Sequence, residues 1–214
     1  MKTKIILVRH GQSQGNAKRV LLGHTDLDLT ELGFGQAALT AEALKDEKID
    51  AIYSSDLKRA MSTARAHAVL RGLTVNPDVN LREVMLGDWE NCSVQEIMEK
   101  YGEKVYNEDW LGNFGTFKFP GGDRVMGRAR IFFDEVKRLS EENPGKTLLI
   151  AAHAAVIRGF FGLVRDLSDE EVSTKTTFPS NASYSVVYYE EGRFIEDSFS
   201  VDAHLEGIGI TKIN

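Results

Sequence analysis

Lys4-Ile5-Ile6-Leu7-Val8-Arg9-His10-Gly11 is a run of apolar, partly β-branched residues that ends abruptly in a cation, an imidazole and a glycine. Its four apolar residues have the length of a buried strand, and Gly11 lets the backbone turn at once. In open α/β sheets, ligands bind beyond the carboxyl ends of the strands. The stretch therefore predicts a core strand with Arg9 and His10 at the edge of a site. An isolated Arg-His pair is more often ordinary structure, so the rest of the chain has to decide.

Length and composition favour one soluble α/β domain with an insertion. The chain has 214 residues, of which 42% are hydrophobic and 27% charged, as in ordinary globular proteins. Its net charge of -6 repels phosphate backbones, which argues against nucleic acid or an anionic membrane as a partner. A small anionic substrate would need a local cluster of arginines.

Cysteine usage and the apolar runs indicate a cytoplasmic protein. The single cysteine, Cys92, excludes an internal disulfide framework and a cysteine-based metal site, which fits a reducing compartment. The run from Ile5 to Val8 is too short for a signal peptide, and the run from Leu148 to Ala152 is too short to span a membrane.

A second apolar run also ends in a histidine. Residues 147–152 predict a continuous strand that ends at His153, and an apolar helix follows at 155–164. Another short strand, at 49–53, precedes a helix predicted to start near Asp56, with Arg59 in its first turn. Strands that alternate with helices predict a largely parallel sheet, whose carboxyl ends share one edge. We therefore expect two arginines and two histidines to converge there.

The chemistry of these four side chains favours a phosphoryl ligand. Two guanidinium groups offer planar, permanently charged donors that suit phosphate oxygens. Clustered histidines also suit a metal, but the sequence has no His-x-His, His-Glu-x-x-His or cysteine pattern, and adjacent arginines would repel a cation. We expect no metal and no cofactor.

A catalytic acid is expected between Leu81 and Glu90. In this segment acidic residues stand among apolar ones without a clear helical or strand period, which is a better setting for a catalytic acid than a solvated helix face. Glu83, Asp88 and Glu90 are all candidates, and periodicity does not choose among them.

Three further segments complete the expected organisation. Residues 73–75 predict a third strand before a turn at 76–78, and residues 182–189 and 192–198 predict a strand pair. The aromatic, glycine-interrupted segment 103–120 predicts either a partly mobile cover over a pocket or a hydrophobic cluster under a loop.

Five segments, in this order, resemble motifs of the histidine phosphatase superfamily: Arg9–Asn16, Leu22–Gly33, Ser54–Ala60 with Thr63-Ala64, Leu81–Glu83 with Gly87–Glu90, and Ala152–Arg158. The resemblance covers nearly the whole chain. It implies a phosphoglycerate-mutase-like fold, a three-layer α/β/α sandwich around a mostly parallel mixed sheet. Residues 1–214 would form a single domain, with a helical and aromatic cover inserted at about 91–122.

The resemblance also implies roles for particular residues. His10 would be the nucleophile that becomes phosphorylated, and Glu83 would be the general acid and base. The phosphate and substrate would be bound by Arg9, Ser13, Asn16, Gly23, Arg59, His153 and Ala154.

The function implied is a metal-independent phosphomonoesterase acting on small phosphorylated metabolites, in the broad-specificity or α-ribazole-phosphatase-like branch. Two alternatives are a phosphoglycerate mutase and a module that binds a phospho-ligand without turnover. The sequence does not name the substrate and leaves the oligomeric state open, with a homodimer among the allowed states.

Three residues depart from the family pattern. Ala154 and Asn91 stand where glycine is usual, and Arg124 stands where serine or threonine often follows the double glycine. These departures put the usual substrate specificity in doubt. One hypothesis is that Arg124 or Lys118, beside the expected cover, meets a second negative charge on the substrate.

Overall fold

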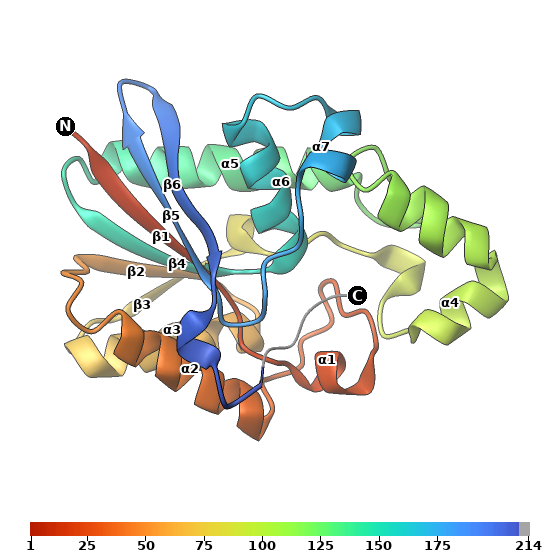
Figure 1. Cartoon of the computed structure of the whole chain (residues 1–214), viewed down its shortest axis with the longest axis horizontal. Helices are drawn as coiled ribbons and strands as arrows, with labels where there is room; N and C mark the ends of the chain where they lie inside the picture. The colour runs from red at the N-terminus through yellow and green to blue at the C-terminus, as the bar shows by residue number, and fades with distance from the viewer. Residues whose placement is uncertain (210–214) are drawn as a thin grey trace.

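A computed structural model describes residues 1–209, whose strands form one mixed sheet (Figure 1). The spatial order of its six strands is β3-β2-β4-β1-β5-β6. β1, β2, β3 and β4 pair in parallel, whereas β5 pairs antiparallel with both β1 and β6. The strand bounds are Thr3–Arg9 (β1), Ala51–Ser55 (β2), Val75–Asp78 (β3), Thr147–Ala152 (β4), Tyr184–Glu190 (β5) and Arg193–Val201 (β6).

Helices cover both faces of this sheet. Figure 1 shows α2 (Glu31–Ala43) and α3 (Lys58–Arg71) on one face, and α5 (Val125–Glu142) and α6 (Ala154–Val164) on the other. Side chains of a strand alternate between faces, so Ile5 and Leu7 join one core cluster while Ile6 and Val8 join the second. The expected three-layer α/β/α sandwich around a mostly parallel mixed sheet is confirmed.

The central strands are those expected from continuous apolar runs. β1 lies between β4 and β5, and Ile5, Ile6 and Val8 are fully buried. β4 is likewise buried from Leu148 to Ala152. A strand that is buried on both faces has no solvent-facing side, so polar residues do not alternate with the apolar ones in its sequence.

The predicted bounds of the third strand, 73–75, and of the turn that follows it, 76–78, are wrong. β3 runs from Val75 to Asp78 and contains Pro77, which had indicated a turn. Among the strands of residues 1–209, β3 pairs with β2 alone and forms an edge of the sheet. Proline lacks a backbone donor, and an edge strand tolerates that loss because one side of the strand needs no partner.

Three shorter helices lie outside the main layers. They are α1 (Gln14–Lys18), α4 (Val94–Tyr101) and α7 (Asp169–Lys175). α1 begins directly after Ser13, because Ser13 and Asn16 form a reciprocal capping box at its start. α4 and the π-helical segment Val105–Gly112 extend from one end of the sandwich (Figure 1).

An aromatic cluster holds this extension together. The Trp110 ring lies 4.8 Å from Phe119, 5.3 Å from Phe114, 5.5 Å from Phe117 and 6.2 Å from Phe178, measured between ring centroids. Phe114 and Phe119 are fully buried. The aromatic side chains of 103–120 therefore pack as an ordered hydrophobic cluster.

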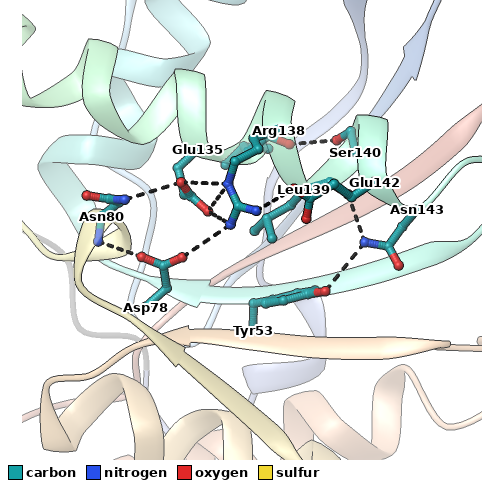
Figure 2. Close-up of polar contacts among 10 residues, drawn as sticks. Tyr53, Asp78, Asn80, Glu135, Arg138, Leu139, Ser140, Glu142 and Asn143 are labelled. Carbon is teal, nitrogen blue, oxygen red and sulfur yellow. Dashed lines mark hydrogen bonds and ion pairs between the residues drawn. The ribbon is translucent and has the colours of Figure 1, made fainter.

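A polar network fixes the turn that precedes Glu83 (Figure 2). Asn80 Nδ2 donates to Glu135 Oε2 on α5 at 3.3 Å, and the Asn80 backbone N–H donates to Asp78 Oδ1 at 2.8 Å. Arg138 pairs with Glu135 and lies 3.7 Å from Asp78. Burial, together with the neighbouring Glu135, raises the pKa of Asp78. The network ties the end of β3 to α5 and so limits where Glu83 can lie.

Among residues 1–209, no helix combines the length and the apolar character needed to cross a membrane.

The burial of His67, on α3, leads us to expect that the folded protein loses stability in acid. Its ring is fully buried, and within residues 1–209 neither ring nitrogen has a hydrogen-bond partner. Burial, with the nearby Arg71 charge, lowers the pKa of His67 from 6.5 to about 3. The unfolded chain therefore takes up a proton below about pH 6.5 that the folded chain does not, which costs about 2 kcal/mol of stability at pH 5.

We expect His67→Leu to remove this contribution. Its thermal midpoint should fall less than that of the wild type between pH 7.5 and pH 5, as measured by calorimetry at both values. An equal fall in the two proteins would contradict the assignment.

Candidate active site

A cavity of about 120 Å³ opens beyond the carboxyl end of β1. Eight of the nine residues expected at the site line it: Arg9, His10, Ser13, Asn16, Gly23, Arg59, Glu83 and Ala154. The ninth, His153, is fully buried beside the cavity, and its ring centroid lies 5.2 Å from that of His10. The structure thus brings together residues from four distant segments of the chain.

His10 is held as a neutral imidazole. Its Nδ1 lies 2.7 Å from the Gly11 carbonyl oxygen, which can only accept, so Nδ1 carries the proton and Nε2 keeps its lone pair. Burial, and then the charges of Arg59 and Arg9, lower the pKa of His10 well below 6.5. An unprotonated Nε2 is the form required of a nucleophile.

The two arginines are buried and lack ion pairs with the described residues. Arg59 Nη2 donates to the Gly23 carbonyl at 2.7 Å and Nη1 to the Thr25 carbonyl at 3.0 Å. Arg9 Nη1 donates to the Pro179 carbonyl, while its Nε has no partner in the described part of the chain. Burial lowers the pKa of each to about 10, so both stay charged at neutral pH. Two buried cations bonded to neutral carbonyls form a site for an anion.

Glu83 reaches the cavity from the segment that follows β3, which is fixed by the polar contacts of Asp78 and Asn80 with α5 described above. Its Oε2 accepts from the Ala155 N–H at 3.0 Å, and its Oε1 accepts from the Val156 N–H at 3.1 Å and from the Val84 N–H at 3.0 Å. The Ala155 and Val156 N–H groups are in the first turn of α6, where backbone donors lack partners within the helix, and they hold the Glu83 side chain at the cavity.

The structure separates the three candidate acids. Glu83 lines the cavity, and Asp88 and Glu90 do not. Glu90 instead supports the 23–25 loop, because its Oε1 accepts from the His24 N–H at 2.9 Å and its Oε2 from the Thr25 hydroxyl at 3.1 Å. That loop supplies the backbone carbonyls that accept from Arg59, so Glu90 helps to position the Arg59 side chain and does not face the cavity itself.

Asn16 presents its amide to the cavity. Its Oδ1 accepts from the Ser13 N–H at 3.0 Å, the Ser13 hydroxyl at 2.9 Å and Asn181 Nδ2 at 3.2 Å. With the oxygen occupied, the NH₂ group is left as the donor for a ligand.

Asn181 is a site residue that sequence reasoning missed. Its Nδ2 donates to the carbonyls of His10 at 2.9 Å and Gly11 at 3.1 Å, so it fixes the backbone that carries the imidazole. Asn181 is fully buried in the loop before β5. No local pattern marks it, because it reaches His10 only through the antiparallel pairing of β5 with β1.

The outer wall of the cavity is apolar and was also missed in part. It includes Val20, Leu21, Leu22, Tyr106, Trp110 and Phe178. Tyr106 and Trp110 come from the segment expected to be a cover, whereas Phe178 comes from the loop that follows α7.

The hypothesis for Arg124 and Lys118 is not supported by their position. Both are exposed and neither lines the cavity, and Arg124 Nη1 donates to the Thr116 carbonyl at 3.3 Å.

The structure accommodates the two residues that stand where glycine is usual. Asn91 has the positive φ of 59° that glycine would adopt, and Ala154 is the first residue of α6, where its methyl group fits beside the cavity.

Comparison with known proteins places the chain in a family. Residues 5–202 match the family model described as Histidine phosphatase superfamily (branch 1). The chain belongs to this superfamily. The match covers most of the chain, so the resemblance drawn from the five motifs is confirmed.

Phosphatases are found among the relatives of this histidine phosphatase. It is 33% identical over 206 residues to phosphoserine phosphatase 1 of Hydrogenobacter thermophilus, covering 94% of both chains. It is 30% identical over 219 residues to a metal-independent phosphoserine phosphatase of Arabidopsis thaliana, covering 98% of this chain and 86% of that one. These relatives support phosphatase activity.

A solved structure supports the same class. The mycobacterial glucosyl-3-phosphoglycerate phosphatase in complex with VO₃ matches with a TM-score of 0.85 and 26% identity, covering 93% of this chain and 99% of that one.

Among residues 1–209, no three His, Cys, Asp or Glu side chains gather closely enough to hold a metal ion.

Proposed function

We propose that this protein hydrolyses phosphomonoesters of small metabolites through a phosphohistidine formed on His10, with Glu83 as general acid and base and without a metal. The observation that carries the proposal is the cavity floor, where a neutral imidazole lies with two buried arginines that form no ion pair within residues 1–209, although the charge of Glu83 acts on both. A phosphoryl group supplies the missing charge and the electrophile.

In the first half-reaction, His10 Nε2 attacks phosphorus in line with the ester oxygen. The N–P bond forms as the P–O bond breaks, and protonated Glu83 gives its proton to the departing alkoxide. Arg9 and Arg59 stabilise the negative charge that spreads over the equatorial oxygens. Asn16 and neutral His153 contribute further N–H donors.

In the second half-reaction, a water molecule takes the place of the alcohol. Glu83 removes its proton, the water oxygen attacks phosphorus, and the N–P bond breaks to restore neutral His10 and release inorganic phosphate. We propose that the segment 91–122 acts as the cover, since Tyr106 and Trp110 close one side of the cavity and limit access of bulk water.

The test is phosphate release from a panel of phosphomonoesters in the presence of EDTA. We expect turnover to be unchanged by the chelator, because the arginines supply the positive charge that a metal would otherwise provide. Loss of activity in EDTA that returns with added metal would contradict this mechanism. Conversion of 3-phosphoglycerate to its 2-isomer without net phosphate release would favour the mutase alternative.

A further inference from the structure

The cavity has two chemically different halves. Its floor holds the charged groups Arg9, Arg59 and Glu83, whereas its outer wall is built from aliphatic and aromatic side chains. Within that wall the polar side-chain groups are the Tyr106 hydroxyl and the Trp110 indole N–H, and both are neutral. A substrate whose phosphoryl group lies on the floor must place its leaving group against this wall.

The wall offers no cation to a negatively charged leaving group. Among the described residues, the arginines that line the cavity are Arg9 and Arg59, and both are oriented toward the phosphoryl position by bonds to backbone carbonyls. Lys18 and Arg19, next to Val20, are exposed and do not line the cavity.

The aromatic part of the wall is suited to a ring. Trp110 is 6% exposed, and its place is set by contacts with four phenylalanine rings, so it is an ordered surface. Phe178 faces the same cavity. Aromatic groups gain both apolar burial and favourable edge or offset contacts against such a surface.

We infer that this enzyme prefers phosphomonoesters whose leaving alcohol is uncharged and aromatic or otherwise apolar, and that it discriminates against leaving groups that carry a carboxylate, such as those of phosphoserine and phosphoglycerate. The inference rests on the proposed function. It assigns Trp110 as a residue that determines specificity.

Three esters of primary alcohols test the inference without large differences in leaving-group reactivity: 2-phenylethyl phosphate, ethyl phosphate and O-phospho-L-serine. We expect kcat/KM for 2-phenylethyl phosphate to exceed that for ethyl phosphate by about 10-fold or more, as apolar pockets discriminate on this scale. O-phospho-L-serine should fall below ethyl phosphate. If phosphoserine equals or exceeds ethyl phosphate, the inference is overturned.

Variants locate the preference. Trp110→Leu should reduce the ratio of 2-phenylethyl to ethyl phosphate, while Phe34→Leu, a matched change on the exposed surface of α2, should not. Because Trp110→Leu removes a core contact, a second variant, Val20→Lys, adds a cation at the half-buried wall. It should raise the ratio of phosphoserine to ethyl phosphate. An unchanged ratio in both folded variants would overturn the assignment of the wall.

The two proposals fail in different ways. If none of the three esters is hydrolysed by the wild type, the proposed phosphatase function fails. If all are hydrolysed but phosphoserine leads, the function stands and the inference about the leaving group fails.

Discussion

Replacing His10 by alanine is expected to reduce kcat for phosphate release by about four orders of magnitude or more, because removing a covalent nucleophile removes the reaction path and not only one contact. The arginines and Glu83 remain in place, so phosphate should still bind. Initial rates of phosphate release at saturating substrate measure the effect. His204→Ala removes a half-buried imidazole outside the cavity and is the matched control.

The same variant tests the intermediate. Wild-type enzyme quenched during turnover should carry acid-labile, base-stable phosphate on His10, and His10→Ala should carry none. Because the pKa of His10 lies well below 6.5, acidification from pH 8 through 6.5 should not slow formation of this intermediate through protonation of the nucleophile. Substantial activity in folded His10→Ala would end the proposed mechanism.

Glu83→Gln is expected to lower kcat by about 10²–10⁴-fold, the range typical of a lost general acid or base. The glutamine keeps the shape of the side chain and still accepts from the first turn of α6 through its carbonyl. The effect should depend on the leaving group. With 4-nitrophenyl phosphate the first step needs little proton donation, so the phosphoenzyme should accumulate and give a burst of nitrophenol.

Glu103→Gln, an exposed change in the segment before Val105–Gly112, is the control for Glu83→Gln. It should retain the wild-type kcat and show no burst. If Glu83→Gln has normal turnover with alkyl esters, the carboxylate that donates the proton has been assigned wrongly.

The sequence was most informative where residue pattern and fold follow from the same physical cause. β1 and β4 are buried on both faces, so each appears as an unbroken apolar run, and parallel pairing brings their ends to one edge. That is enough to predict that His10 and His153 meet. The position of Arg59 at the same edge can be predicted too, because β2 lies next to β4 and α3 starts three residues beyond the end of β2.

What sequence pattern alone left open depends on contacts between distant segments. Glu83 is distinguished from Asp88 and Glu90 by its bonds to the N-terminus of α6, which periodicity does not encode. Asn181 and Phe178 reach the site because β5 returns antiparallel beside β1. Pro77 was interpreted as part of a turn because the edge position of β3 is not visible in local sequence.

The position of β1 has a consequence for biosynthesis. Its sheet partners are residues 147–152 and 184–189, so the strand that carries the nucleophile has no sheet neighbour until those residues have left the ribosome. Pairing between such distant segments closes large loops and is slow. We expect nascent chains to expose the apolar strand β1 until its partner strands have been synthesised, which makes them clients for chaperones, and to acquire catalytic competence only after that.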